Sequence, residues 1–512
     1  MIVKNNTKRG CWNIMVFNSV KYLFFLPIVI LVYFIIPKKI KYIWLLIVSY
    51  YFYMCWNAKY AVLIFFSTIT TYLCGILIEI LKKKELEYKR KVLLSKSFVA
   101  ICLLLNIGIL FYFKYTSFFF RNLYIFLSKM NINISMPAFD IILPVGISFY
   151  TFQAIGYIID VYRNEINAEK NVFKYALFVS FFPQLVAGPI ERSKNLLFQF
   201  REYTKFDIMK AKTGLMTIAY GLFLKMVIAD NISSVIDPLF SNPDNYTGIM
   251  LLMAVILFAF QIYCDFNGYT KIAIGSACIL GYKLNENFDS PYFALSIKDF
   301  WRRWHISLTS WFRDYVYIPL GGSRKGKIRK QINTMIIFLL SGLWHGAAWH
   351  FIAWGGVNGL FSVIEDVFFK YWHLFLERLK INYESKIYKM FQRIITFMLV
   401  DFTWLFFRAN SFTSAVHICK KIIKGFKLES FLDFGFLNMF TSTSTMIIIF
   451  ISILIMIVID RLKYQGKDIM LLIFNQQLFW RWCIYWIILL LVIYWGAYGM
   501  EYEQTQFIYF QF

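Results

Sequence analysis

Long apolar runs separated by short polar segments recur along the whole chain. Four of the clearest runs occupy residues 22–37, 42–56, 60–81 and 446–458. A helix of about 20 apolar residues crosses the hydrocarbon core of a bilayer, because it satisfies its own backbone hydrogen bonds. The pattern therefore predicts an all-α polytopic membrane protein with roughly 11–13 transmembrane or re-entrant helices.

Some apolar segments are interrupted by residues that disfavour a straight helix. Residues 141–159 contain Pro144, Gly146 and Gly156. Such interruptions are tolerated at membrane depth where the backbone is buried in protein or lines a cavity. We expect this segment, and others like it, to form broken or re-entrant helices.

Composition and charge agree with this prediction. Hydrophobic residues make up 59% of the chain and charged residues only 16%, whereas soluble domains hold about 45–50% and about 25%. The net charge is +25, but the basic residues lie between apolar runs. The excess of Lys and Arg in cytoplasmic loops explains this placement, so nucleic-acid binding is a poor interpretation.

The chain shows no long linker, low-complexity segment or clear internal repeat, which predicts a single membrane domain over residues 1–512. Its eight cysteines form no CxxC pair and lie mostly in apolar runs, as small buried hydrophobic residues do.

One segment departs from the apolar pattern. Residues 298–330 interleave nine basic residues with aromatic ones and hold only two acids, Asp299 and Asp314. The charge predicts a cytoplasmic position, and the Trp and Tyr side chains favour the membrane interface.

An uncharged stretch, residues 331–364, follows directly and is too long for one helix. We expect two helices with a break at Gly355 and Gly356. If the first is helical from Lys330, His345 lies about 22 Å further along its axis, well inside the hydrocarbon core.

Glycines at 342 and 346 flank His345 at a spacing that lets a neighbouring helix approach closely. An ionisable side chain inside a membrane is a functional candidate by default, because its burial is costly. We therefore expect His345 to face the protein interior and to be functional.

The other four histidines carry weaker signals. His350 follows His345 by five residues, about 140° around a continuous helix, and is expected to be structural. His373 and His417 lie in polar junctions and are expected to be structural as well. His305 lies in the basic aromatic segment, where packing and function are equally good interpretations.

Several catalytic patterns are incomplete or missing. No HExxH or Cys/His pattern supports a metal site. Residues 321–327, GGSRKGK, fit the first part of a phosphate-binding loop, but Ile328 stands where Ser or Thr would bind magnesium. A GxSxG nucleophile motif is absent too. What remains is a deep imidazole that could act as a general base on a hydroxyl.

A set of motifs closely resembles the membrane-bound O-acyltransferase family, in the branch of alginate O-acetyltransferases. The resemblance covers nearly the full length and keeps that branch's order. The motifs are LPVGISFYTFQAIGYIIDVYR (143–163), FFPQLVAGPIERSKNLLFQF (181–200), QIYCDFNGYTKIAIG (261–275), FWRRWHISLTSWFRDYVYIPLGGSRKGK (300–327), SGLWHGAAWHFIAWGGVNGL (341–360), WLFFRANSFTSA (404–415) and FIYFQF (507–512). One departure is Lys271, where the family usually has an acidic or neutral polar residue.

The resemblance implies helices arranged around a central funnel, with His345 as the family's near-invariant histidine and His305 as the second catalytic candidate. It also implies a multi-pass protein of the bacterial cytoplasmic membrane that acts in exopolysaccharide or envelope O-acetylation, as in alginate biosynthesis. The expected acyl donor is cytoplasmic acetyl-CoA, with no tightly bound cofactor and no metal. The expected acceptor is an extracytoplasmic polysaccharide, reached through a hydrolase-fold partner protein.

Two alternative functions stay open at this point. Within the same family, a shorter relative transfers D-alanine from a carrier protein to teichoic acid. From another class, a polysaccharide or lipid-precursor transporter would show repeat symmetry and paired acids at the membrane midplane, and neither is evident.

Overall fold

The computed structural model describes residues 15–132, 141–186, 188–426, 429, 432–440 and 442–498, and all regular secondary structure over this part of the chain is helical. The C-terminal motif at 507–512 lies outside the described residues. The chain divides into two compact units, one formed by residues 1–218 with 272–285 and the other by 219–271 with 286–512. The prediction of a single domain over the whole chain stays a prediction.

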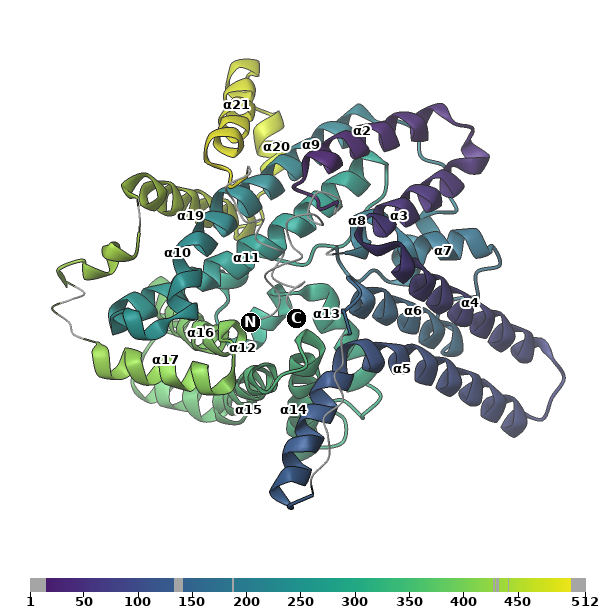
Figure 1. Ribbon diagram of the computed structural model, residues 1–512, viewed down its shortest axis with the longest axis horizontal. Helices are drawn as coiled ribbons and strands as arrows, with labels where there is room; N and C mark the ends of the chain where they lie inside the picture. Colours follow the sequence, from purple (N-terminus) through teal and green to yellow (C-terminus); the bar gives the residue numbers. More distant parts are fainter. Residues whose placement is uncertain are drawn as a thin grey trace. The chain divides into compact units, whose positions relative to one another are not determined.

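The first unit contains the N-terminal apolar runs, and each of these runs is a helix. The helices are α2 (Val20–Ile35), α3 (Lys41–Asn57), α4 (Ala61–Lys83), α5 (Tyr88–Lys129), α6 (Ile147–Tyr162), α7 (Val172–Ser180), α8 (Phe182–Leu185) and the start of α9 (Ile208–Leu222). Figure 1 shows α4, α5 and α6 packed side by side.

The predicted interruption at the start of α6 is confirmed. The segment 141–146 is not helical, and α6 holds only 16 residues. Gly146 adopts a left-handed backbone conformation with φ of 75°. A Cβ atom at this position would lie 2.6 Å from the carbonyl oxygen of Leu185, so a glycine is required there.

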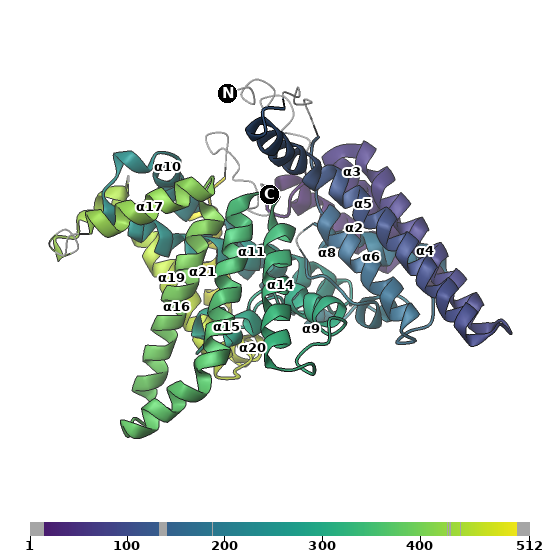
Figure 2. The same ribbon diagram turned by 90° about the horizontal axis from the view of Figure 1, so that it is seen from below.

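The second unit contains the remaining helices. They are the end of α9, a π-helical segment, η5 (Phe223–Ala229), α10 (Asp230–Ser241), the part of α11 (Gly248–Ile279) up to residue 271, α12 (Ile297–Arg303), α13 (Ile306–Phe312), α14 (Lys327–His345), α15 (Trp349–Arg378), α16 (Lys386–Arg408), α17 (Phe412–Gly425), α19 (Thr443–Tyr464), α20 (Ile469–Phe474) and α21 (Leu478–Trp495). In Figure 2, α14, α15 and α16 run alongside one another.

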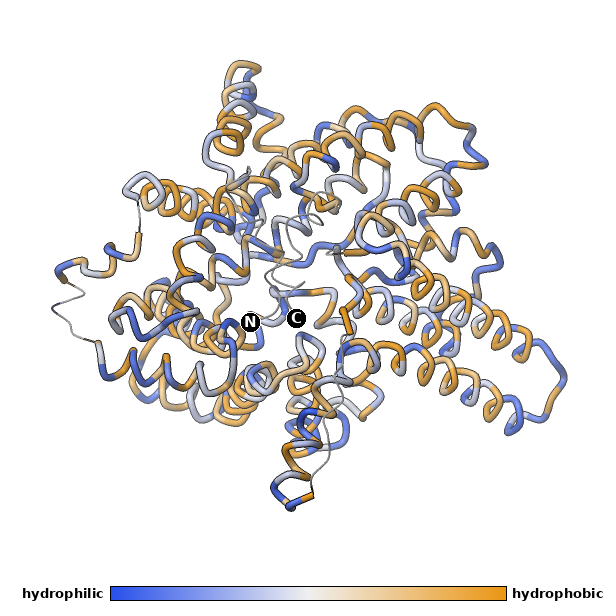
Figure 3. Tube along the Cα trace, viewed as in Figure 1, coloured by the Kyte–Doolittle hydropathy of each residue, from blue (hydrophilic) through white to orange (hydrophobic). Residues whose placement is uncertain are grey.

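Eight helices among the described residues are long and apolar enough to cross a membrane. Among the same described residues, α2 is a shorter apolar helix. Figure 3 shows apolar residues along most of α4 and α5 and polar residues in the loop that joins them. The protein is therefore a multi-pass membrane protein, as its sequence predicts.

Candidate active site

The hairpin of α14 and α15 positions His345. The two helices approach so closely that glycines replace side chains at the contact. A Cβ atom on Gly342 would lie 2.3 Å from the carbonyl oxygen of Phe351, and one on Gly355 would lie 2.2 Å from that of Phe338. Backbone therefore packs directly on backbone, as in other small-residue helix contacts in membranes.

The position of the break between the two helices differs from the prediction. Helix α15 runs continuously through Gly355 and Gly356, and the break lies at residues 346–348 instead. Gly355 thus serves close helix packing rather than chain reversal. Because α14 is helical from Lys327, the predicted rise from Lys330 to His345 holds, and His345 is the last residue of that helix.

Aromatic side chains surround the imidazole of His345, whose residue is only 4% exposed. Its ring centroid lies 4.9 Å from Trp354, 5.3 Å from Phe407 and 5.0 Å from Trp344. The expected burial is thus confirmed. Such surroundings exclude water and strengthen electrostatic interactions with a reacting group.

His305 is fixed in place by the turn between α12 and α13. It has a left-handed backbone conformation, with φ of 43°, just before α13 begins. Asn287 holds this turn in two ways: its carbonyl oxygen accepts the amide of Ile306 at 3.0 Å, and its Oδ1 accepts the amide of Ser307 at 3.3 Å. A left-handed non-glycine residue is uncommon and marks a constrained position.

The fold brings His305 and His345 together, although 40 positions separate them in the sequence (345 minus 305). Their ring centroids lie 6.4 Å apart, and His305 is fully buried against Phe266 at 4.7 Å. Trp344 contacts both rings, at 5.8 and 5.0 Å. Burial lowers the pKa of His305 to about 3, so its imidazole is neutral near pH 7.

Two acids that the sequence analysis did not single out anchor the site. Asp366 of α15 accepts hydrogen bonds from Lys330 at 2.6 Å and from Lys298. The neighbouring Glu365 accepts the amide of Ile297 at 2.7 Å, at the first turn of α12. These contacts tie α12 and α14 to α15. The sequence marks these two acids as the first charged residues after the uncharged stretch 331–364.

A buried ion triad joins η5, α10 and α11. Lys225 of η5 contacts Asp230 at 2.7 Å and Asp265 at 2.6 Å, and each of the three side chains is at most 5% exposed. Asp265 directly precedes Phe266 on α11, so the triad fixes the wall against which His305 packs. In the sequence, Lys225 lies inside an apolar run, and a charged residue in such a run indicates a buried polar contact.

The basic residues of the aromatic segment are mostly exposed or engaged in local contacts. Arg303 bonds Asp299 at 2.9 Å and stacks on Tyr464 at 5.0 Å. Arg302, Arg324 and Lys325 are exposed.

The unusual Lys271 forms an ion pair with Glu286 at 2.8 Å, so a local carboxylate compensates its charge. The pair involves two positions outside the predicted catalytic set, and both lie in the second unit.

The structure does not bring the other histidines into this site. His350 lies at the start of α15, not further along the same helix as predicted, and its ring contacts that of Phe351 at a tilt, with the centroids 4.2 Å apart. His417 pairs with Asp244 at 2.8 Å on the surface. The side chain of His373 lies outside the described residues.

The glycine-rich segment 321–327 does not have the context of a phosphate-binding loop. It follows the π-helical turn Arg313–Tyr317 and leads into α14, whereas a phosphate-binding loop follows a buried strand. Asn333 donates to the carbonyl oxygen of Gly322 at 3.0 Å and so secures the turn.

A many-spanning helical fold that buries two histidines among aromatic rings defines a multi-pass membrane protein with a candidate site in its interior. The sequence profile of the membrane-bound O-acyltransferase family matches residues 163–375. A probable alginate O-acetylase of Azotobacter vinelandii is 36% identical over 398 residues, which are 78% of this chain and 76% of that protein. The chain belongs to the membrane-bound O-acyltransferase family and is an O-acyltransferase.

Two further relatives show how widely the resemblance extends. A peptidoglycan O-acetyltransferase of Helicobacter pylori is 34% identical over 442 residues, 80% of each chain. A teichoic acid D-alanyltransferase of Bacillus subtilis is 29% identical over 287 residues, 54% of this chain and 71% of that protein. The match to O-acetyltransferases is therefore longer and stronger than the match to the D-alanyltransferase.

Proposed function

We propose that this acyltransferase moves an acetyl group from cytoplasmic acetyl-CoA to hydroxyl groups of an extracytoplasmic polysaccharide, with His345 and His305 as its catalytic residues. The observation that carries the proposal is the approach of two buried imidazoles, 6.4 Å apart, within an acyltransferase. Two imidazoles this close to each other can both contact one acyl group and the hydroxyl that attacks it, which holds the reactants in position.

In this mechanism His345 is the general base. It takes the proton of the acceptor hydroxyl while the hydroxyl oxygen attacks the thioester carbonyl carbon. The carbon–sulfur bond then breaks, and His345 returns the proton to the leaving thiolate. General base catalysis of this kind contributes about 10²–10⁴-fold in rate.

His305 has a second role, as a hydrogen-bond donor in the buried site. A neutral imidazole keeps one N–H group, which can donate a hydrogen bond to the thioester carbonyl oxygen. Negative charge develops on that oxygen during attack, and a fixed donor in a water-poor site stabilises it strongly. The constrained turn held by Asn287 would keep this donor in place.

Acetyl transfer is favoured over D-alanyl transfer by the extent of the relationship. Both O-acetyltransferase relatives cover at least three quarters of this chain, whereas the D-alanyltransferase covers 54%. The relatives differ in their acceptors, one being an alginate O-acetylase and another a peptidoglycan O-acetyltransferase. The two relatives have similar sequence identity to this chain, so neither acceptor is favoured. We therefore propose an envelope polysaccharide as the class of acceptor. A hydrolase-fold partner outside the membrane would complete transfer to the polymer.

The test compares His345→Ala and His305→Ala with His350→Ala, which removes a histidine of the same motif that lies outside the site. Each variant is expressed in cells that lack the native protein, and alkali-released acetate is measured on isolated envelope glycans. We expect His345→Ala to lower acetylation by about 10²–10⁴-fold and His305→Ala by about 10²–10³-fold. His350→Ala should keep wild-type acetylation.

Membrane abundance of each variant is measured in the same cells, so that loss of protein is not mistaken for loss of catalysis. Substantial acetylation by His345→Ala would overturn its assignment as the base. Release of D-alanine in place of acetate would overturn acetyl transfer in favour of the D-alanyl alternative. Incorporation of label from labelled acetyl-CoA into vesicles tests the donor directly.

A further inference from the structure

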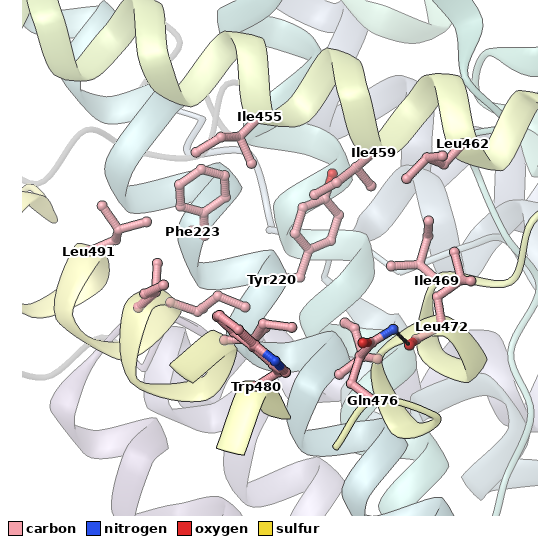
Figure 4. Close-up of a pocket in the computed structure, with 14 residues that line it drawn as sticks. Tyr220, Phe223, Ile455, Ile459, Leu462, Ile469, Leu472, Gln476, Trp480 and Leu491 are labelled. Atoms are coloured by element: carbon pink, nitrogen blue, oxygen red, sulfur yellow. Dashed lines mark hydrogen bonds between the residues drawn. The ribbon is translucent and has the colours of Figure 1, made fainter. Parts of the chain in front are cut away.

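A cavity of about 500 Å³ lies in the second unit, between α19, α20, α21, the end of α9 and the start of η5. Figure 4 shows its labelled side chains pointing toward a common space, with Ile455 and Ile459 from α19 facing Trp480 and Leu491 from α21. The cavity is separate from the histidine site, since it shares no lining residue with the imidazole surroundings described above.

The lining of the cavity is almost entirely apolar. Among the described residues that line it, none is charged, and the side-chain amide of Gln476 donates to the carbonyl oxygen of Leu472 at 3.2 Å. Tyr220 and Trp480 each add an aromatic ring that carries one polar group. An apolar cavity of this size favours a hydrocarbon ligand over a polar substrate.

The length of the cavity matches the depth of one membrane leaflet. Its lining on α21 runs from Trp480 to Leu491, which at about 1.5 Å per residue spans about 16 Å. The hydrocarbon core is about 30 Å thick, so one leaflet is about 15 Å deep. A single acyl chain therefore fits the cavity from end to end.

Charge gathers at only one end of the cavity. Arg461 precedes the lining residue Leu462, Lys467 lies two residues before Ile469, and Arg481 follows Trp480. By contrast, residues 446–457 and 484–495, which form the other end, contain no charged residue.

The acids near the charged end are already engaged. Asp468 caps α20 by accepting the amide of Met470 at 2.9 Å, and Asp460 accepts the hydroxyl of Tyr263 at 2.8 Å. Arg461 and Lys467 are exposed. The net positive end is thus available to an anionic group, and Lys and Arg in short loops mark the cytoplasmic side.

We propose that this cavity binds an anionic phospholipid of the cytoplasmic leaflet, with one acyl chain in the cavity and the phosphate near Lys467 and Arg481. The acyl chain accounts for the apolar lining and its length. The phosphate accounts for the cations at one end, each of which attracts an anionic headgroup. This site is independent of the proposed acetyl transfer.

The experiment measures lipid retained by the purified full-length protein. The protein in mild detergent is exposed to phosphatidylglycerol or phosphatidylcholine, and native mass spectrometry counts the bound lipids. We expect retention of phosphatidylglycerol to exceed that of phosphatidylcholine by roughly fivefold for each cation that contacts the phosphate. Equal retention of the two lipids would overturn the anionic headgroup.

Two kinds of variant separate the chain site from the headgroup site. Ile459→Trp fills the cavity and should abolish retention of both lipids, whereas Ile447→Trp changes an exposed position on the same helix and should not. Unchanged retention by Ile459→Trp would overturn the cavity as the chain site.

The double variant Lys467→Gln/Arg481→Gln leaves the cavity lining intact, so it keeps the proposal testable if the tryptophan variant fails to fold. It should lose the preference for phosphatidylglycerol while keeping retention of phosphatidylcholine. A preserved preference would overturn these two residues as the phosphate site. Lipid retention requires no acetyl transfer, so failure here is distinct from failure of the histidine assignment.

Discussion

The α14–α15 hairpin and helix α21 are both apolar, yet they are packed in opposite ways. In the hairpin, glycines let one backbone touch the other, and His345 is only 4% exposed. None of the 18 residues of α21, all of which the structure describes, is buried. Apolar composition therefore indicates that a helix enters the membrane, but small residues and paired polar groups decide which helix lies inside the protein.

Two hydrogen bonds attach the C-terminal end of helix α21. Asn231 donates to the carbonyl oxygen of Trp495 at 2.8 Å, and the amide of Ala497 donates to Met226 at 3.0 Å. Both contacts lead to η5 and its neighbour α10. The rest of α21 borders the proposed lipid cavity or faces outward, so lipid replaces the protein contacts that the hairpin has.

The largest effect is expected from a side chain at the glycine contact of the hairpin. Gly355→Leu should prevent the hairpin from closing, because even a Cβ atom there would lie 2.2 Å from the carbonyl oxygen of Phe338. Gly356→Leu is the matched control, since its Cβ atom would meet only Leu339 at 3.7 Å. Membrane abundance and elution as a single species in detergent measure the difference.

We expect Gly355→Leu to be degraded or aggregated and Gly356→Leu to behave like the wild type. Similar behaviour of the two variants would contradict the direct backbone contact.

Much of this contrast could be predicted from the sequence. The apolar runs predicted the helices, and the glycines around His345 predicted a close helix contact and a buried imidazole. The sequence predicts the break between α14 and α15 at Gly355 and Gly356, because glycines look like helix breakers, but the break lies at residues 346–348. In a membrane, however, glycine is tolerated within a helix wherever a neighbouring helix packs against it.

The site itself was less predictable from spacing alone. For His305, spacing alone leaves packing and function as equally good interpretations, because a turn and 40 residues of chain separate it from His345. The family resemblance is what identifies it as a catalytic candidate. Asn287 and Asp366 could not be singled out, since their roles depend on which backbone groups the fold brings to them. Long-range polar contacts of this kind have no local periodicity in the sequence.

A smaller but still strong effect is expected from the ion triad next to η5. Lys225→Met should lower the free energy of unfolding by about 3–5 kcal/mol, because it leaves the carboxylates of Asp230 and Asp265 buried without their cation. Thermal unfolding in detergent measures the loss. This variant also tests the support of α21, which packs on η5.

The triple variant Lys225→Met/Asp230→Asn/Asp265→Asn is the control for this prediction. Removing all three charges should restore most of the stability, since no uncompensated charge remains buried. A triple variant as unstable as the single one would show that the residues contribute by shape rather than by charge pairing.

The smallest effect is expected from truncating an exposed leucine of α21 to alanine. The same truncation of a leucine inside the protein is the comparison. Leu489 is 46% exposed and does not line the cavity, so Leu489→Ala should change the free energy of unfolding by at most about 0.5 kcal/mol. Leu405 of α16 is 2% exposed, and Leu405→Ala should cost about 2–5 kcal/mol. A loss of several kcal/mol at Leu489 would mean that protein, not lipid, covers this face of α21.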